Sequence, residues 1–225
     1  MTNQEFSNEF DILYNNITSN QAPGLTEYEK SVILTQAQDS FVLDIYKGNT
    51  DAYSFESTEE ATSYLGDLVK QSILSTPISS ESKISSSSVF FQLPSDVWFI
   101  TYESVILNDD RLCCKSGQEA LVKHITQDEY YSLSRNPFRG PNDIRVLRLL
   151  IGDKAELISK YSIQSYLIRY LSEPEPIILE DLEEYGTSIK GKTSITECKL
   201  NPVVHRIILN LAVQIAKNIW ASGLS

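Results

Sequence analysis

The sequence contains few of the residues on which catalytic and metal sites depend. Two histidines and three cysteines occur among 225 residues, and neither an HExxH nor a CxxC motif is present. A zinc site needs three or four such ligands at fixed spacings. The sequence therefore predicts no metal site, no cofactor and no catalytic residue. We interpret His205 as a surface or interface residue and His124 as a packed or hydrogen-bonded one.

The cysteines do not form an obvious disulfide framework. Cys113 and Cys114 are adjacent, which is an awkward geometry for a redox pair, and Cys198 has no evident partner. This usage is typical of a reducing compartment. A run of 18 apolar residues and a basic leader followed by an apolar segment are also absent. We therefore expect neither a membrane segment nor a signal peptide.

Basic residues are scarce, and the deficit is concentrated in one region. The chain has 19 Lys and Arg against 30 Asp and Glu, a net charge of −11. Residues 1–75 hold 12 acidic residues against 3 basic ones, whereas 76–150 and 151–225 each hold 9 against 8. The basic stripe that neutralises phosphates in nucleic-acid binders is missing. The acidic excess is either a solvated face or a surface that repels DNA.

The first 74 residues show helical periodicity. One apolar stripe recurs at i, i+4, i+7 and i+11, formed by Phe6, Phe10, Leu13 and Ile17. Thr26 and Glu29 have the spacing of a capping box, which predicts a second helix from Glu27 to Tyr46. That helix is apolar on more than one side, so its own domain or a neighbouring copy must cover it. A third helix is expected over Glu59–Leu74, followed by a serine-rich loop.

The middle of the chain changes to the alternating pattern of strands. Expected strands are Val89–Leu93, Val97–Leu107, Arg111–Lys115, Leu121–Ile125, Ile144–Ile151, Ala155–Ser159 and Ser165–Leu171. Asn108–Asp110 supplies turn residues that would make Arg111–Lys115 the hairpin partner of the strand before it. A second capping box at Thr126 predicts a short helix through Leu133. The proline-rich and glycine-containing loop Ser134–Asp143 follows it.

The end of the chain predicts a long helix over Pro202–Trp220. Asn201 is a suitable N-cap and Pro202 suits the first helical position. The expected core stripe is Val204, Ile208, Leu211, Ile215 and Ile219.

These elements predict an α+β fold, in which the N-terminal helices and the long C-terminal helix form a helical bundle with an inserted antiparallel β region. The expected divisions are a helical part over 1–75, a serine-rich loop over 76–88, a β-rich part over 89–182, and a segment over 183–225. In that last segment a hairpin or loop precedes the C-terminal helix, which packs on the N-terminal helices.

Two segments have the composition of a ligand site. The acidic run Glu180–Glu184 could bind a cation, but adjacent acids are usually a solvated face. Gly186–Thr193 (GTSIKGKT) satisfies the GxxxxGK[ST] spacing of a phosphate-binding loop. Such a loop must follow a buried strand and open a helix, whereas acidic residues precede this one and a polar segment follows it. We interpret the match as coincidence and the segment as a flexible hairpin tip.

Four segments, in the same order along the chain, carry a resemblance to a known family. They are Asn16–Tyr46, Asn136–Arg148 (NPFRGPNDIRVLR), Tyr166–Leu182 and Glu197–Ala216. Together they resemble structural proteins of crAss-like bacteriophages, tailed phages of gut Bacteroidales. Within that group they are similar to the neck and tail-barrel ring proteins that stack below the portal. The family brings no catalytic residues to carry over.

The resemblance implies a non-catalytic ring subunit of the head-to-tail connector. It implies a homo-oligomer, a dodecamer like the portal, that contacts neighbouring ring, portal or tail proteins and surrounds a channel through which DNA passes without specific binding. The helices would pack against adjacent copies, and the Ser134–Asp143 loop would contact the ring above or below. The protein would lie in the virion after assembly in the host cytoplasm. The alternatives are a nucleotide hydrolase acting through Gly186–Thr193 and a capsid or fibre adaptor outside the channel.

Overall fold

The computed structural model describes residues 1–17, 24–48, 63–79, 83–112, 117–136 and 138–223. By its internal contacts the chain divides into two compact units. The helical unit comprises Met1–Leu68 and Pro174–Ser225, and the sheet unit comprises Val69–Glu173. The four parts expected from the sequence, with divisions at residues 75, 88 and 182, remain a prediction.

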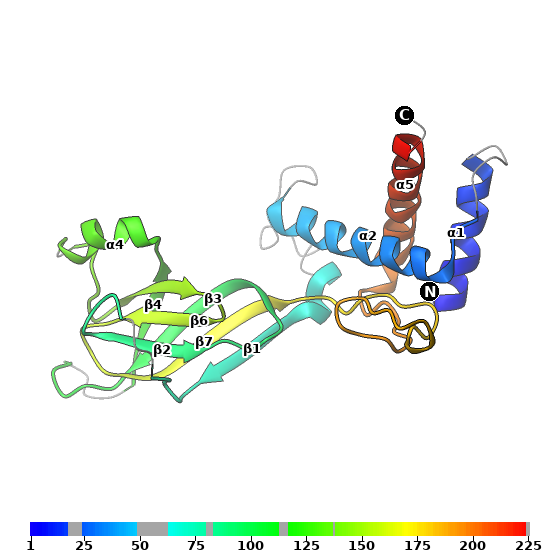
Figure 1. The fold of residues 1–225 in the computed structure, drawn as a ribbon. Helices are drawn as coiled ribbons and strands as arrows, with labels where there is room; N and C mark the ends of the chain where they lie inside the picture. Colours follow the sequence, from blue (N-terminus) through cyan, green and yellow to red (C-terminus); the bar gives the residue numbers. More distant parts are fainter. Residues whose placement is uncertain (18–23, 49–62, 80–82, 113–116, 137, 224–225) are drawn as a thin grey trace. The chain divides into compact units, whose positions relative to one another are not determined.

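In the described part of the helical unit there are three long helices: α1 (Asn3–Ile17), α2 (Glu27–Lys47) and α5 (His205–Gly223). The capping box at Thr26 is present, with both its hydrogen bonds, and α2 ends at Gly48 in the left-handed conformation. A turn of 3-10 helix, η3 (Pro202–Val204), leads into α5, and the Asn201 side chain accepts a hydrogen bond from Val203 N. α5 packs against both α1 and α2 (Figure 1).

The core of the helical unit lies between these three helices and the irregular segment that precedes α5. Phe6, Phe10 and Tyr14 line the inner side of α1, as the sequence stripe predicts for the two phenylalanines. The segment includes a turn of 3-10 helix, η2 (Glu183–Tyr185), and buries its apolar residues Ile177, Ile178, Leu182 and Ile189. In the described residues no helix is long and apolar enough to cross a membrane.

One seven-stranded sheet forms most of the sheet unit (Figure 1). Its strands are β1 (Val69–Leu74), β2 (Ser88–Gln92), β3 (Val97–Leu107), β4 (Gln118–His124), β5 (Arg145–Ile151), β6 (Lys154–Ile158) and β7 (Ile163–Ser172). They lie in the order β1-β7-β3-β4-β5-β6-β2. All neighbours are antiparallel except β4 and β5, which are parallel. α4 (Gln127–Ser134) and the loop after it form the crossover that this parallel pair requires.

The two faces of the sheet are covered differently. One face carries the main core, formed by Phe91, Leu93, Val105, Leu107, Leu112, Ala120, Val146, Ala155, Leu157, Tyr166, Ile168 and Tyr170. On the other face, α4 covers β5 and β6 through a smaller cluster that contains Leu133, Leu147, Leu149 and Ile158. The exposed side chains of Ile73 and Leu121 lie away from both clusters. Both clusters consist entirely of residues of the sheet unit.

The expected helical bundle with an inserted antiparallel β region is wrong. The fold is dominated by a mixed seven-stranded sheet, and one of its pairings is parallel. Of the helix expected over Glu59–Leu74, residues 59–62 lie outside the described chain. The rest continues from a short helical turn into η1 (Gly66–Leu68) and then into β1. Six-residue pairing of β1 with β7 overrides the local helical pattern, because strand pairing satisfies every backbone group on one side of β1.

Candidate assembly surfaces

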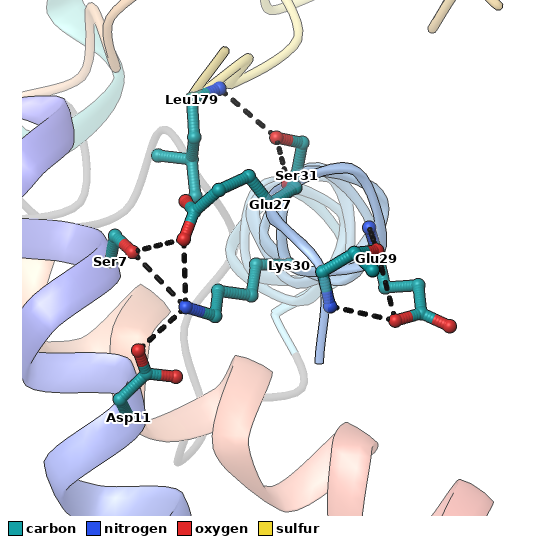
Figure 2. Close-up of polar contacts among 8 residues, drawn as sticks. Ser7, Asp11, Glu27, Glu29, Lys30, Ser31 and Leu179 are labelled. Atoms are coloured by element: carbon teal, nitrogen blue, oxygen red, sulfur yellow. Dashed lines mark hydrogen bonds and ion pairs between the residues drawn. The ribbon is translucent and has the colours of Figure 1, made fainter. Parts of the chain in front are cut away.

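A buried ammonium group fixes α1 against α2 (Figure 2). The Nζ atom of Lys30 donates to Asp11 Oδ2 at 2.7 Å, to Glu27 Oε1 at 2.9 Å and to Ser7 Oγ at 3.1 Å. Burial lowers the pKa of Lys30, but the hydrogen bonds to Asp11 and Glu27 outweigh that effect and the pKa is raised. Lys30 is thus a protonated structural residue that connects α1 and α2, and all three of its N–H groups donate hydrogen bonds.

Replacing Lys30 with methionine is expected to lower the free energy of unfolding by about 1–3 kcal/mol. The loss stays below that of a fully buried pair, because Asp11 and Glu27 are half-exposed and water can solvate them. Urea denaturation followed by circular dichroism measures it. Lys70→Met is the matched control, since its ion pair with Asp96 is exposed and should contribute at most about 1 kcal/mol. Equal losses in the two variants would contradict this view of Lys30.

A polar stripe on α2 holds the segment that precedes α5. Ser31 Oγ accepts from Leu179 N at 3.0 Å, Thr35 Oγ1 accepts from Ile177 N at 3.1 Å, and Gln38 Nε2 donates to Glu175 O at 2.8 Å. These three buried residues follow one another at i, i+4 and i+7 on α2. The side of α2 that has to be covered therefore faces its own unit. The sequence signal was the helical spacing of these three polar residues around the apolar run Val32–Leu34. We expected apolar packing from the sequence and missed this signal.

η3 and α5 together carry an uncharged outer face, called here the uncharged face of α5 and defined as Val203, Ile207, Asn210, Gln214 and Asn218. All five are exposed, with Val203 at 65% and Ile207 at 47%. Four of them repeat at about 3.6 residues along α5 and share one side of it. The only charged residues that α5 carries are Arg206 and Lys217, and Arg206 pairs with Glu9 on α1 at 2.9 Å. The face combines two apolar residues, Val203 and Ile207, with three uncharged amides, and depletion of charged residues is typical of interface centres.

The core side of α5 differs from the predicted stripe. Val204 and Ile208 are buried as expected, but Ile219 is exposed and Leu211 and Ile215 are half-buried. The buried side is completed instead by Leu209, Ala212, Val213 and Ala216. At about 100° per residue, the predicted stripe lies to one side of the line formed by His205, Leu209, Ala212 and Ala216, which faces the core, so several of its members are only partly covered.

The tip loop, residues 134–143, is described for residues 134–136 and 138–143, where several hydrogen bonds surround an exposed aromatic side chain. Asn136 Oδ1 accepts hydrogen bonds from the backbone N atoms of Phe138 and Arg139 at 2.9 and 3.2 Å. Arg145 donates from Nη1 to Phe138 O at 2.9 Å, and Gly140 N donates to Asn136 O at 2.8 Å. A Cβ atom on Gly140 would lie 2.9 Å from Asn136 O, so the turn requires glycine. Phe138 is nevertheless 85% exposed.

α4 adds to this aromatic and basic surface. The capping box at Thr126 is present, so the sequence prediction of this helix is confirmed within one residue. Tyr131 is exposed, and the Arg135 guanidinium carbon lies 4.1 Å from its ring centroid. Arg135 and Arg139 are both exposed. Tyr131, Arg135, Phe138 and Arg139 are residue types that supply binding energy at interfaces.

A buried ion pair lies on the core face of the sheet. Arg148 Nε on β5 is 2.9 Å from Glu103 Oε1 on β3, and both side chains are buried. The Tyr166 hydroxyl on β7 donates to the same carboxylate. Burial raises the pKa of Glu103 although Arg148 and Tyr166 oppose it, and burial raises the pKa of Tyr166 as well. This trio ties three strands together within the apolar core and offers no reacting group to solvent.

The phosphate-loop spacing at Gly186–Thr193 lacks the required structure. Ile189 and Lys192 exchange backbone hydrogen bonds at 3.0 Å, with Lys190 and Gly191 at positive φ, so this is a tight hairpin turn. Between Thr193 and Asn201, all described, no helix begins. Lys192 Nζ is 3.1 Å from Glu175 Oε1. The predicted hairpin is present, its flexibility stays a prediction, and the lysine is paired with a carboxylate.

The two histidines differ in burial from what the sequence predicted. His205 is buried: its Nε2 is 2.8 Å from Leu200 O and its ring packs on Phe6, so the prediction of a surface residue is wrong. Burial lowers the pKa of His205. His124 is exposed at the end of β4, and partial desolvation and the charge of Arg148 lower its pKa.

The other candidate functional residues from the sequence are the cysteines and the acidic run Glu180–Glu184. Cys198 is buried and donates to Gln38 Oε1 at 3.2 Å, and burial raises the pKa of its thiol to about 11. Cys113 and Cys114 lie outside the described residues. Glu183 and Glu184 are exposed on η2. In the described part of the chain no group of three or more His, Cys, Asp or Glu side chains has the geometry of a metal site.

The described residues thus present packed cores, charged side chains held in ion pairs, and exposed aromatic or uncharged surfaces, which is the character of a structural component. Comparison with known proteins gives the particular class. The chain matches the phage tail ring protein 3/4 family over residues 1–222, and it belongs to that family. It is a structural ring protein of crAss-like bacteriophages, as the four sequence segments predicted.

Two relatives come from Bacteroides phage crAss001. The chain is similar to its Ring protein 3, with 51% identity over 219 residues, covering 96% of this chain and 95% of the relative. It is also similar to its Ring protein 4/5, with 35% identity over 236 residues, covering 100% of this chain and 95% of the relative. Both matches extend through the helical and the sheet unit, so the likeness concerns the whole architecture.

Proposed function

We propose that this chain is a non-catalytic subunit of a closed homo-oligomeric ring in the head-to-tail connector of the virion, with dodecameric symmetry. The ring joins portal and tail, contacts the neighbouring rings and surrounds the DNA channel, after assembly in the host cytoplasm. The observation that carries the proposal is the end-to-end match to two proteins named as rings. A ring needs each copy to offer two different surfaces, one for each neighbour.

The uncharged outer face of α5 supports self-association. The helical unit holds 18 Asp and Glu against 7 Lys and Arg, so it carries the whole net charge of the chain. Two negatively charged helical units repel each other, and this repulsion is weakest when they make contact through a surface without charged side chains. Val203 and Ile207 lie on such a surface, and burying them against a neighbour removes apolar area from water. We assign this face to the contact between adjacent copies.

The same charge distribution bears on the channel. An acidic surface repels the phosphate backbone, so DNA can pass a ring without adhering to it. We expect no detectable binding of the purified chain to duplex DNA at moderate salt. Fluorescence anisotropy of a labelled duplex measures this, with a basic protein of similar size as the positive control. Submicromolar binding that weakens as salt rises would contradict the proposal for the channel.

The enzyme alternative predicts a different result at the hairpin of residues 189–192. Because Lys192 already pairs with Glu175 and no helix follows the turn, we expect no binding of ATP at millimolar concentration. Isothermal titration calorimetry of the chain and of Lys192→Ala tests it. ATP binding that disappears in the variant would favour a nucleotide hydrolase.

The mass of the purified full-length chain tests the ring itself. Native mass spectrometry at micromolar concentration should show one closed oligomer of many copies with few open intermediates. A chain that stays monomeric up to the highest soluble concentration would contradict a self-assembling ring. It would favour an adaptor on the capsid or fibre, outside the channel.

A further inference from the structure

The face of the sheet that α4 covers over β5 and β6 carries an exposed apolar strip over its other strands. Strand register places four side chains in one row across β1, β7, β3 and β4: Ile73, Leu167, Ser104 and Leu121. Ile73 and Leu121, at the two ends of the row, are 59% and 58% exposed, and Tyr102 in the adjacent row is 39% exposed. Exposed apolar surface that extends over several strands marks a site of protein contact. These five residues are called the sheet strip.

The surroundings of the sheet strip have no acidic excess. The charged residues that alternate onto this face of the four strands are Glu119, Lys123 and Arg169, and Asp143 and Arg145 follow at the start of β5. Arg169 donates from Nε to Gln71 at 3.1 Å, and its guanidinium carbon lies 5.9 Å from the Tyr102 ring centroid. A partner on the strip therefore lies beside three cations and two carboxylates.

η3 and α5 present an apolar ridge long enough to cover the sheet strip. Its members follow one another at intervals of four residues: Val203, Ile207, Leu211, Ile215 and Ile219. Val203, Ile207 and Ile219 are exposed, and the two between them are half-buried. Residues four apart form the ridges by which helices pack, and this ridge extends for about 24 Å. Four strands span about 14 Å between the outer two, so about three helical turns cover them.

We propose that the apolar ridge of one copy docks on the sheet strip of the next copy of this chain. The inference rests on the proposed ring, and it names the surface that the α5 side of the contact meets. A closed ring needs two different surfaces in each contact, whereas ridge against ridge would pair two copies about a two-fold axis. The charges favour the same choice. The helical unit holds 18 acidic and 7 basic residues, so it is repelled by a second helical unit, whereas the sheet unit holds 12 of each.

Two complementary variants of the full chain test the contact. Leu121→Glu places a carboxylate in the sheet strip and Ile207→Glu places one in the ridge, so native mass spectrometry should find each variant monomeric, with an unchanged circular dichroism spectrum. Mixed in equal amounts at the highest soluble concentration, they should form a dimer with one copy of each, because the intact ridge of the first docks on the intact strip of the second. Leu150→Glu is the control. Leu150 is 43% exposed on the opposite face of the sheet, and its variant should assemble like the unaltered chain.

Photochemical cross-linking of the assembled chain gives the second readout. Gln214, an exposed amide beside the ridge, is replaced by p-benzoylphenylalanine, and this chain is assembled together with an isotopically heavy, unmodified chain. After irradiation, mass spectrometry should find light-to-heavy links whose heavy peptides lie in β1, β3, β4 or β7. The same analogue at Ile12, 59% exposed on α1, should give far fewer of these links.

Three results would overturn the proposal: normal assembly of Leu121→Glu, a mixture of the two variants that stays monomeric, or heavy peptides confined to α5. If the unaltered chain forms oligomers and one of these results is found, the docking site is wrong and the ring remains. If the unaltered chain is itself monomeric by native mass spectrometry, both proposals fail.

Discussion

Replacing Arg148 with methionine is expected to destabilise the sheet unit by about 3–5 kcal/mol. The substitution removes the guanidinium from a buried ion pair and leaves the Glu103 carboxylate in the core with only the Tyr166 hydroxyl as partner. An unpaired buried charge costs far more than the pair contributes, so the effect should exceed that of any exposed substitution. Equilibrium denaturation in urea measures the change.

A double variant separates charge from packing. Arg148→Met combined with Glu103→Gln should recover much of the lost stability, because an amide carries no charge and can still accept from Tyr166. The single variant should also depend on pH. Burial already raises the pKa of Glu103, and loss of Arg148 raises it further. Folding then favours the protonated form, so the variant should become more stable as the pH falls through the folded pKa. A loss that is independent of pH and of Glu103 would contradict this explanation.

Replacing Ile207 with glutamate is expected to abolish assembly while leaving the subunit folded. Ile207 is 47% exposed on the uncharged face of α5, so the new carboxylate stays hydrated in the monomer. In an assembled ring the same carboxylate would be buried beside a neighbour that carries an acidic helical unit, which costs several kcal/mol. Native mass spectrometry should show monomers, with an unchanged circular dichroism spectrum and melting temperature.

Ile12→Glu is the matched control for that experiment. Ile12 lies on α1 in the same unit, is 59% exposed, and follows the charged residue Asp11. A further carboxylate there adds to an already acidic surface and should leave the oligomer intact. If Ile12→Glu dissociates the ring and Ile207→Glu does not, the contact between copies lies on α1 and not on α5.

Local signals in the sequence predicted individual elements well. The capping boxes at Thr26 and Thr126 located the starts of α2 and α4, because the two reciprocal hydrogen bonds depend only on residues three apart. Alternation over Val97–Leu107 gave both ends of β3. Asn201 and Pro202 located the start of η3, the 3-10 turn that leads into the last helix at His205. In each case the determining contacts lie within one or two turns of chain.

Strand pairings between segments distant in the sequence were harder to predict. β1 forms because β7, about a hundred residues later, offers it an edge, and its local pattern suits a helix equally well. The partner expected for β3 was Arg111–Lys115, of which residues 113–115 lie outside the described chain. Asp109 does form the turn, binding the Arg111 guanidinium, but the strand that pairs with β3 begins at Gln118. The parallel pairing of β4 and β5 depends on the path of the crossover, which no residue pattern encodes.

The candidate surfaces were partly visible in the sequence. The tip loop was predicted from its turn residues, and Phe138 between proline and arginine has no apolar period to place it in a core. The uncharged face of α5 could have been found from the spacing of Ile207, Asn210, Gln214 and Asn218. It was missed because Leu211, Ile215 and Ile219 were assigned to the core stripe, whereas Leu209, Ala212 and Val213 fill that role.

Electron cryomicroscopy of the intact virion tests the central claim most directly. The account predicts a closed ring of many copies of this chain between portal and tail, with DNA passing through it and α5 at the contact between neighbours. Copies found only on the capsid surface or on fibres, or a ring in which α5 faces solvent throughout, would contradict it.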